Sequence, residues 1–206
     1  MVDPDKFWSV SPPEAREERR VTRIVGVPEK DAGLLRRFAY RFSRRRFGKV
    51  PEPVRATAHH RKVLLGMGAM ELALNRSDLV DARLKKLAEM KVALVVGCEF
   101  CVDIGSMLGK GLGITDYQLR ALPRFRESAA FSPLEKLVLE YAAGMSGTPA
   151  AVPDRLFGEL RGYFDEAKLV ELTATITWEN HRAALQPHPG YGLPGLLRRL
   201  LLHPAR

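Results

Sequence analysis

Only two cysteines occur in this 206-residue chain, and they stand three positions apart, at Cys98 and Cys101. So small a number excludes the disulfide-rich scaffolds of small secreted proteins. The five histidines are also sparse. None of them completes a four-ligand zinc site around the pair, so we expect no metal. Two roles remain open for the cysteines: buried structural residues or a redox pair.

Long apolar runs are also missing. The longest candidates, VALVVG and LLRRLLL, are short or interrupted by arginine, whereas a membrane-spanning helix needs roughly 18 apolar residues. The first ten residues, MVDPDKFWSV, lack the basic segment followed by an apolar one that marks a secretory signal. With 46% hydrophobic residues the chain can bury the core of one globular domain. We therefore expect a soluble cytoplasmic protein that does not bind membranes.

Acidic residues are scarce in the N-terminal third. Residues 1–63 carry 16 Lys+Arg against 8 Asp+Glu, which accounts for +8 of the net charge of +9. The densest stretch, RRFAYRFSRRRFGK, has a composition seen in nucleic-acid-binding segments. However, Leu34, Leu35, Phe38 and Phe42 recur at helical spacing. This spacing favours an apolar stripe that packs, with solvated arginines beside it, over nucleic-acid binding.

Apolar residues follow a helical period throughout, and no alternating strand pairs are found, which predicts an all-α fold. We predict helices over residues 32–47, 54–75, 77–96, 98–108, 115–122, 132–145, 153–163 and 166–185, with a last turn or two in 196–203. Either Ser77 or Asp78 can cap the third helix. The clearest start is SPLE, with Ser132 as the cap and Glu135 three residues later. We divide the chain into a basic arm and helix (1–52), a helical domain (53–188) and a tail (189–206).

The placement of the two thiols favours redox chemistry over a structural role. Positions three apart share a face of a helix, so the sulfur atoms can meet. Gly97 is a plausible stop for the preceding helix, and the pair then opens the next one. Unpaired backbone N–H groups and the helix dipole stabilise a thiolate at such a position.

The segment LKKLAEMKVALVVGCEFCVDIGSMLGKGLGITDYQLRAL resembles the core of the carboxymuconolactone decarboxylase and alkylhydroperoxidase D-like superfamily. The segments FSPLEKLVLEYAAGMSG and FGELRGYFDEAKLVELTATITWENHR are similar to its C-terminal half, so the resemblance covers residues 59–185. It implies an all-α fold and assembly into oligomers. In the redox members it implies hydroperoxide reduction or thiol–disulfide exchange, without a cofactor and with an external dithiol reductant protein.

Two positions depart from the pattern of the peroxidase members, which is a Glu, eleven residues, C-x-x-C, three residues and a His. Here the Glu position holds Lys86 and the His position holds Gly105. The resemblance implies that Cys101 attacks the peroxide and that Cys98 resolves the sulfenic acid as a disulfide. Because the leaving alcohol needs a proton, that proton must come from another residue.

Candidate proton carriers are Glu89, on the preceding helix, and His181, in WENHR on the last long helix. Arg182 of the same motif would favour a thiolate by its charge. We therefore predict a thiol-dependent peroxidase or disulfide reductase with Cys98, Cys101, His181 and Glu89 as its site. The missing Glu and His support the alternative, a non-catalytic or differently catalytic helical oligomer of the same superfamily that has lost the proton relay.

The predicted helix over residues 54–75 carries an apolar face from Val63 to Leu74. A contiguous apolar face of this kind marks an interaction surface when nothing in the same chain covers it. Together with the resemblance, this face predicts a homo-oligomer.

Overall fold

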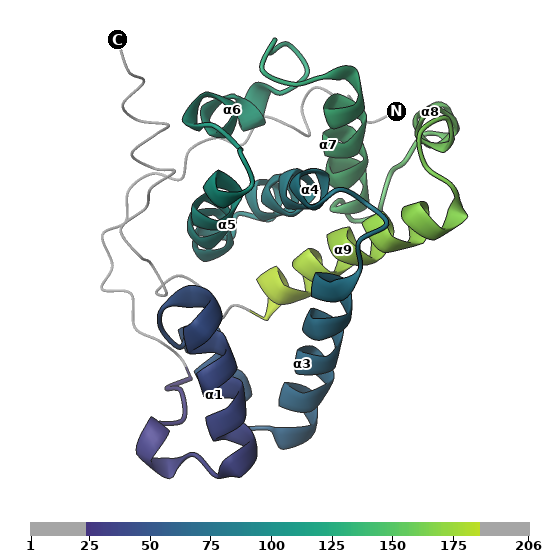
Figure 1. The fold of residues 1–206 in the computed structure, drawn as a ribbon. Helices are drawn as coiled ribbons and strands as arrows, with labels where there is room; N and C mark the ends of the chain where they lie inside the picture. The colour runs from purple at the N-terminus through teal and green to yellow at the C-terminus, as the bar shows by residue number, and fades with distance from the viewer. Residues whose placement is uncertain (1–23, 186–206) are drawn as a thin grey trace.

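The structure, a computed structural model, describes residues 24–185 and is helical throughout that range, with no strand in it (Figure 1). The predicted all-α class is confirmed. The centre is built from four helices: α4 (Ala82–Val95), α5 (Glu99–Gly111), α7 (Pro133–Met145) and α9 (Glu166–Ala184). Helix α4 contacts each of the other three and lies between α5 and α7 in Figure 1, with α9 crossing below.

The core has two parts that meet on α4. On one side α4 packs against α7 and α9, and α7 packs in turn on the short helix α8 (Asp154–Arg161). Val92, Val138 and Leu172 are fully buried there. On the other side Leu87 packs beneath α6 (Asp116–Ala121) and the 3-10 turn η2 (Leu122–Arg124). Each such side chain contributes roughly 1.5–3 kcal/mol to folding. Burial on both sides explains why the sequence of α4 becomes apolar towards its end.

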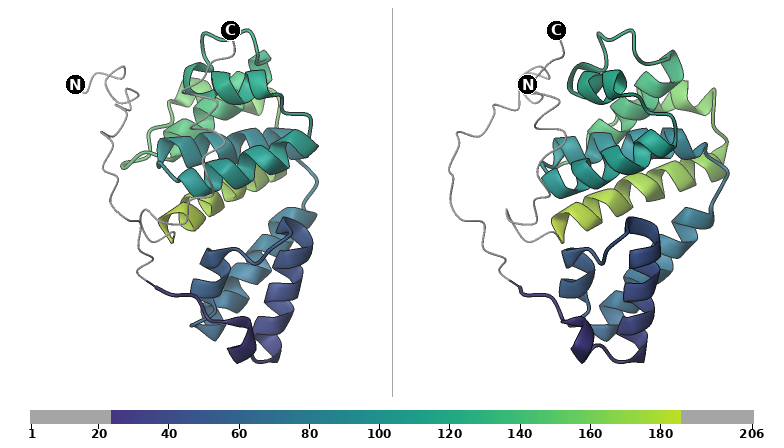
Figure 2. Two further views of the ribbon diagram at one scale, coloured as in Figure 1. Left: turned by 90° about the vertical axis from the view of Figure 1, so that its left-hand side faces the viewer. Right: turned by 60° about the vertical axis from the view of Figure 1, so that its left-hand side comes forward.

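The N-terminal helices form a smaller unit below α9 (Figure 2). It comprises the 3-10 turn η1 (Glu29–Asp31), α1 (Leu34–Phe47), α2 (Glu52–Thr57) and α3 (Arg61–Arg76). Tyr40, Ala58 and Leu64 are buried together in its centre, and the Tyr40 hydroxyl donates to the Val27 carbonyl oxygen at 2.8 Å. Helix α3 also contacts α9, which joins this unit to the rest of the described chain.

Helices with a strong local start signal begin where the sequence predicts. Ser132 and Glu135 form a reciprocal capping box at the start of α7. Thr115 caps α6 in the same way with Gln118, and the Asp165 side chain accepts from the Lys168 N–H at the start of α9. Local capping chemistry therefore fixes these three starts.

The single helix predicted over residues 54–75 is wrong, because the chain breaks between α2 and α3. His60 leaves the helical backbone conformation, with φ −114° and ψ 101°. Its Nδ1 accepts the N–H of Val63 at 3.2 Å, which makes His60 the cap of α3.

The predicted cap of the next helix at Ser77 or Asp78 is also wrong. Helix α4 begins at Ala82, and its cap is Asp81. The Asp81 carboxylate accepts the N–H groups of Arg83 and Leu84 at 2.9 and 3.1 Å, so it satisfies two of the unpaired donors of the first turn.

Contrary to prediction, three of the four stripe residues of α1 stay exposed among the described residues, and only Leu35 is partly buried. Leu34 is 88% exposed, Phe38 71% and Phe42 40%. The opposite face of α1 packs instead: Tyr40 is buried, and the Arg36 Nε donates to the Ala58 carbonyl oxygen at 2.8 Å. Leu34, Phe38 and Phe42 lie on one face of α1, as the spacing predicts, but this face points outward.

No helix between residues 24 and 185 is both long enough and apolar enough to cross a bilayer. The domain boundary between residues 52 and 53 stays a prediction. Residues 1–23, the predicted last turns in 196–203 and the tail from 189 lie outside the described residues.

Candidate functional site

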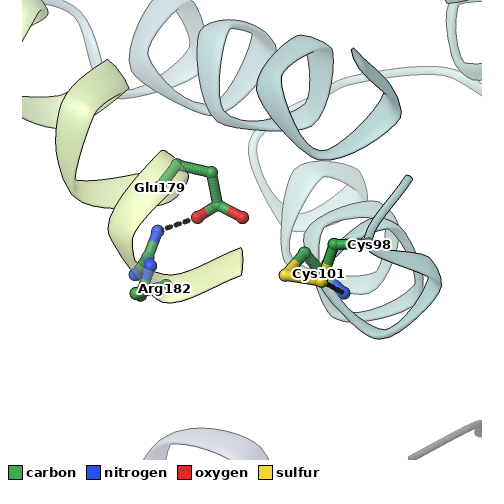
Figure 3. The surroundings of a disulfide bond; sticks show 4 residues. All are labelled: Cys98, Cys101, Glu179 and Arg182. Carbon is green, nitrogen blue, oxygen red and sulfur yellow. Dashed lines mark hydrogen bonds and ion pairs between the residues drawn. A yellow bond between two sulfur atoms is a disulfide. The ribbon is translucent and has the colours of Figure 1, made fainter. Parts of the chain in front are cut away.

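Cys98 and Cys101 form a disulfide at the start of α5, with their Cα atoms 5.3 Å apart (Figure 3). Cys98 is the N-cap of α5, and its Sγ accepts the backbone N–H of Cys101 at 3.2 Å. Cys98 is 8% exposed, whereas Cys101 is partly exposed. In the reduced protein the same N–H group and the positive end of α5 would stabilise a thiolate at Cys98.

The pair is positioned by the way α4 ends. Gly97 has φ +70°, a conformation that glycine adopts without strain. The N–H of Cys98 donates to the Ala93 carbonyl at 2.9 Å and that of Gly97 to the Leu94 carbonyl at 3.3 Å, which is the Schellman pattern. Val102 then packs on Ala93 and holds the first turn of α5 against α4. The predicted stop at Gly97 is confirmed, and it places Cys98 between two helix ends.

A cluster of charged side chains lies beside the disulfide, at the end of α9 (Figure 3). Arg182 is its centre and binds carboxylates from three helices. Its Nη1 donates to Glu71 of α3 at 2.9 Å, and its Nη2 donates to Glu89 of α4 at 3.1 Å and to Glu179 of α9 itself. Glu89 also pairs with Lys86. Figure 3 shows the Glu179 carboxylate on the side of α9 that faces the disulfide.

The carboxyl groups of this cluster differ in pKa because they share one guanidinium unequally. Burial opposes the ionisation of Glu89, but the charges of Lys86 and Arg182 outweigh it and lower the pKa. Burial also opposes the ionisation of Glu71, but the charge of Arg182 and the hydrogen bond from Trp178 outweigh it and lower the pKa of Glu71. Glu179 is the most deeply buried of the three. Its burial, with the nearby Glu89 charge, outweighs Arg182 and raises its pKa to about 7.

The structure brings one of the two predicted proton carriers, Glu89, into this cluster. His181 lies elsewhere: it is exposed, and its ring stacks on Trp178 with centroids 4.8 Å apart. Glu179 and His181 are two positions apart on α9, so their side chains leave the helix on different sides. The Trp178 indole N–H in turn donates to Glu71 at 2.8 Å. His181 therefore flanks the outside of the network that Arg182 holds.

The two positions at which the resemblance implies Glu and His have other roles here. Lys86 forms an ion pair with Glu89. Gly105 is buried where α5 crosses α4, and a Cβ built on it would lie 3.1 Å from the Met90 Cγ. Met90 is itself 1% exposed. A larger side chain at 105 would have to displace it, so close helix packing fills the space that a histidine would need.

Two residues of the cluster, Glu71 and Glu179, were not predicted as site residues. Glu71 is 111 positions from Arg182 along the chain, so no local spacing joins them. A weak signal existed: Glu71 is the single acidic residue in the apolar run VLLGMGAMELAL. A carboxylate in such a run implies a buried partner. Nothing in the sequence around Glu179 indicates its burial.

Comparison with known proteins is consistent with this architecture. Residues 67–144 match the Carboxymuconolactone decarboxylase family. The uncharacterized protein YnjA of Escherichia coli (strain K12) is 37% identical over 158 residues, which are 75% of this chain and 86% of YnjA. The debrominase Bmp8 (apo) superposes with a TM-score of 0.74 at 20% identity, over 88% of this chain and 97% of Bmp8. An uncharacterized peroxidase-related protein from Silicibacter sp. TM1040 gives 0.65 at 16% identity, over 79% and 87%. The last two likenesses establish a shared fold.

Proposed function

Since this chain belongs to the carboxymuconolactone decarboxylase family, as its resemblance predicted, we propose that it is a thiol-dependent oxidoreductase that reduces hydroperoxides or disulfides. The observation that supports this most is the pairing of its only two cysteines at a helix N-terminus. A helix start favours the thiolate, and a separation of three residues lets the disulfide form and open without moving either helix. We place the reaction in the cytoplasm, where dithiol donors regenerate such a pair.

The exposures of the two sulfur atoms suggest their order of action. In the reduced protein the partly exposed Cys101 attacks the peroxide as a thiolate, which breaks the O–O bond and leaves a sulfenic acid and an alkoxide that takes up a proton. Cys98, buried behind it, attacks the sulfenic sulfur, so that the disulfide forms and water leaves. A dithiol reductant protein then attacks Cys101, and Cys98 leaves as a thiolate that the N–H of Cys101 stabilises.

Intact-mass measurement tests this proposal directly. Reduced protein treated with one equivalent of cumene hydroperoxide should lose two hydrogens, and dithiothreitol should restore them. Cys98→Ser should instead trap a sulfenic acid on Cys101 that dimedone labels. Cys101→Ser should be inert to peroxide.

The matched control is the double variant Cys98→Ser/Cys101→Ser, which reports peroxide lost to other groups. Wild-type thiols that react no faster with peroxide than a free thiol, and that reduce no small disulfide such as cystine, would overturn the proposal. That outcome would favour the non-catalytic oligomer instead.

We also propose that the chain assembles with copies of itself through α3. Only one of the sixteen residues of α3, Leu64, is buried. Leu65 is 53% exposed and Leu72 38%, and these two residues, seven positions apart, lie on one face of a helix that carries few charges. A second copy presents the same apolar face, so a two-fold contact between the α3 helices of the two copies would cover both faces. The mass of the particle in solution, measured by sedimentation equilibrium, tests this assembly.

A further inference from the structure

On the basis of the proposed thiol chemistry, we propose that Glu179 is the catalytic acid and base of the redox site and that Arg182 positions it. Cleavage of an O–O bond by a thiolate leaves an alkoxide, and a nearby acid must give it a proton. Glu179 projects from the end of α9 towards the disulfide (Figure 3). It therefore faces the place where the peroxide meets Cys101.

Two other positions on α5 and α4 offer less to this reaction. On α5 the residue one turn after Cys101 is Gly105, which has no side chain and packs on Met90. On α4, Glu89 is held by two cations, Lys86 and Arg182. A carboxylate held in this way stays ionised and cannot give a proton at neutral pH.

Glu179 differs from Glu89 because it meets Arg182 alone. The guanidinium is divided among three carboxylates, and Glu179 has the smallest exposed fraction of them, 7% of its side chain. The charged groups around it are Arg182 on its own helix, Glu89 and Lys86 on α4 and, through Arg182, Glu71 on α3. Together with Glu179 these groups are two cations and three carboxylates, so the cluster is neutral when Glu179 is protonated and carries one negative charge when it is not. Burial of the cluster favours the neutral state.

The proton balance closes over one catalytic cycle. The cycle starts with Cys98 as the thiolate that the Cys101 N–H stabilises, Cys101 as a thiol and Glu179 protonated. Cys101 gives its proton to Cys98 and becomes the attacking thiolate. Attack on the peroxide gives the sulfenic acid, and Glu179 gives its proton to the alkoxide, which leaves as an alcohol. Disulfide formation then releases water and involves no net proton. Reduction by the donor dithiol yields the Cys98 thiolate, the Cys101 thiol and one proton, which Glu179 takes back.

Glu179→Gln tests the assignment, because glutamine keeps the shape and the hydrogen bond but cannot transfer a proton. Single-turnover oxidation of the reduced protein by cumene hydroperoxide should slow by about 100-fold at mildly acidic pH, the lower end of the usual range for general acid catalysis. The wild-type rate should also fall on the alkaline side as Glu179 ionises near pH 7, and the variant should lack that fall. Alkylation by iodoacetamide needs a thiolate but no proton donor, so its rate should change little.

Glu171→Gln is the matched control. Glu171 is a buried carboxylate on the same helix, but it binds Lys85 two turns before Glu179. This variant should keep the wild-type pH profile. If Glu179→Gln oxidises at the wild-type rate with the wild-type profile, the assignment fails while the thiol chemistry stands. If wild-type protein does not react with peroxide at all, the proposed function itself fails.

Discussion

Replacing Glu179 by glutamine should make the stability of the folded chain less sensitive to pH. In the wild type, burial raises the pKa of Glu179 to about 7, above the 4.5 of an ordinary glutamate. The folded chain therefore binds this proton more tightly than the unfolded chain does. The stability gained from that proton is complete below about pH 4.5, and it is lost as pH rises through about 7.

The size of the effect follows from the two pKa values. Each pKa unit corresponds to about 1.4 kcal/mol, so the difference between 4.5 and about 7 amounts to about 3 kcal/mol. Most of this is lost between about pH 5 and about pH 8. Glutamine is neutral at every pH, so the variant keeps the stability that the wild type loses. Glu71 and Glu89 have lowered pKa values and titrate below 4.5, outside this window.

Urea unfolding of the oxidised protein, followed by far-UV circular dichroism, measures both free energies. The free energy of unfolding of the wild type minus that of the variant should fall by about 2–3 kcal/mol from about pH 5 to about pH 8. Glu171→Gln should show no such fall, because the pKa of Glu171 is lowered by Lys85 and its neighbours against the effect of burial, and Glu171 therefore titrates below pH 4.5. A difference between wild type and Glu179→Gln that is the same at both pH values would refute the raised pKa, and with it the premise that Glu179 holds a proton at neutral pH.

Three further predictions concern other parts of the molecule. Glu71→Gln should release the charge of Arg182 to Glu179, lower the pKa of Glu179 and move the alkaline fall of the peroxide rate to lower pH, as a rate–pH profile would show. Leu65→Glu should halve the particle mass in sedimentation equilibrium. The control Val170→Glu, at a 68% exposed site on α9, should leave the mass unchanged. Equal masses for both variants and the wild type would exclude α3 as the interface. Gly144→Ala should lower the free energy of unfolding by roughly 1–3 kcal/mol in urea melts, because the new Cβ would meet a backbone carbonyl oxygen at 2.5 Å; an unchanged midpoint would contradict this.

How much could be predicted from the sequence depended on how local the cause was. The caps at Ser132 and Thr115 and the stop at Gly97 involve groups within five residues, and they were predictable. The break at His60 is equally local, but histidine is a weak capping residue, and the apolar period on both sides of it suggested one helix. Among neighbouring acidic and hydroxyl side chains, nothing in the sequence singled out Asp81 as the cap.

The candidate site shows the same division. That Cys98 and Cys101 can pair follows from their spacing alone, and the structure adds the hydrogen bond that favours one of the two thiolates. The convergence of Glu71, Glu89 and Glu179 on Arg182 joins three helices, and it depends on how α3 and α9 cross. Spacing within one helix indicates which residues share a face. It cannot indicate which face of another helix will meet them, as the exposed stripe of α1 also shows.

Helix α3 connects the proposed assembly with the proposed role of Glu179, because one of its sides faces α9 and the other faces outward. With one buried residue it has little apolar packing to fix its rotation against the rest of the chain. Its inward side is instead held by Glu71, which accepts from both Arg182 and Trp178 of α9. This ion pair is partly buried, and a wrong rotation of α3 would leave its charges unpaired. The same contact that sets how α3 presents Leu65 and Leu72 outward also decides how much of the Arg182 charge reaches Glu179, so the proposed assembly and the proposed proton transfer would both depend on one carboxylate.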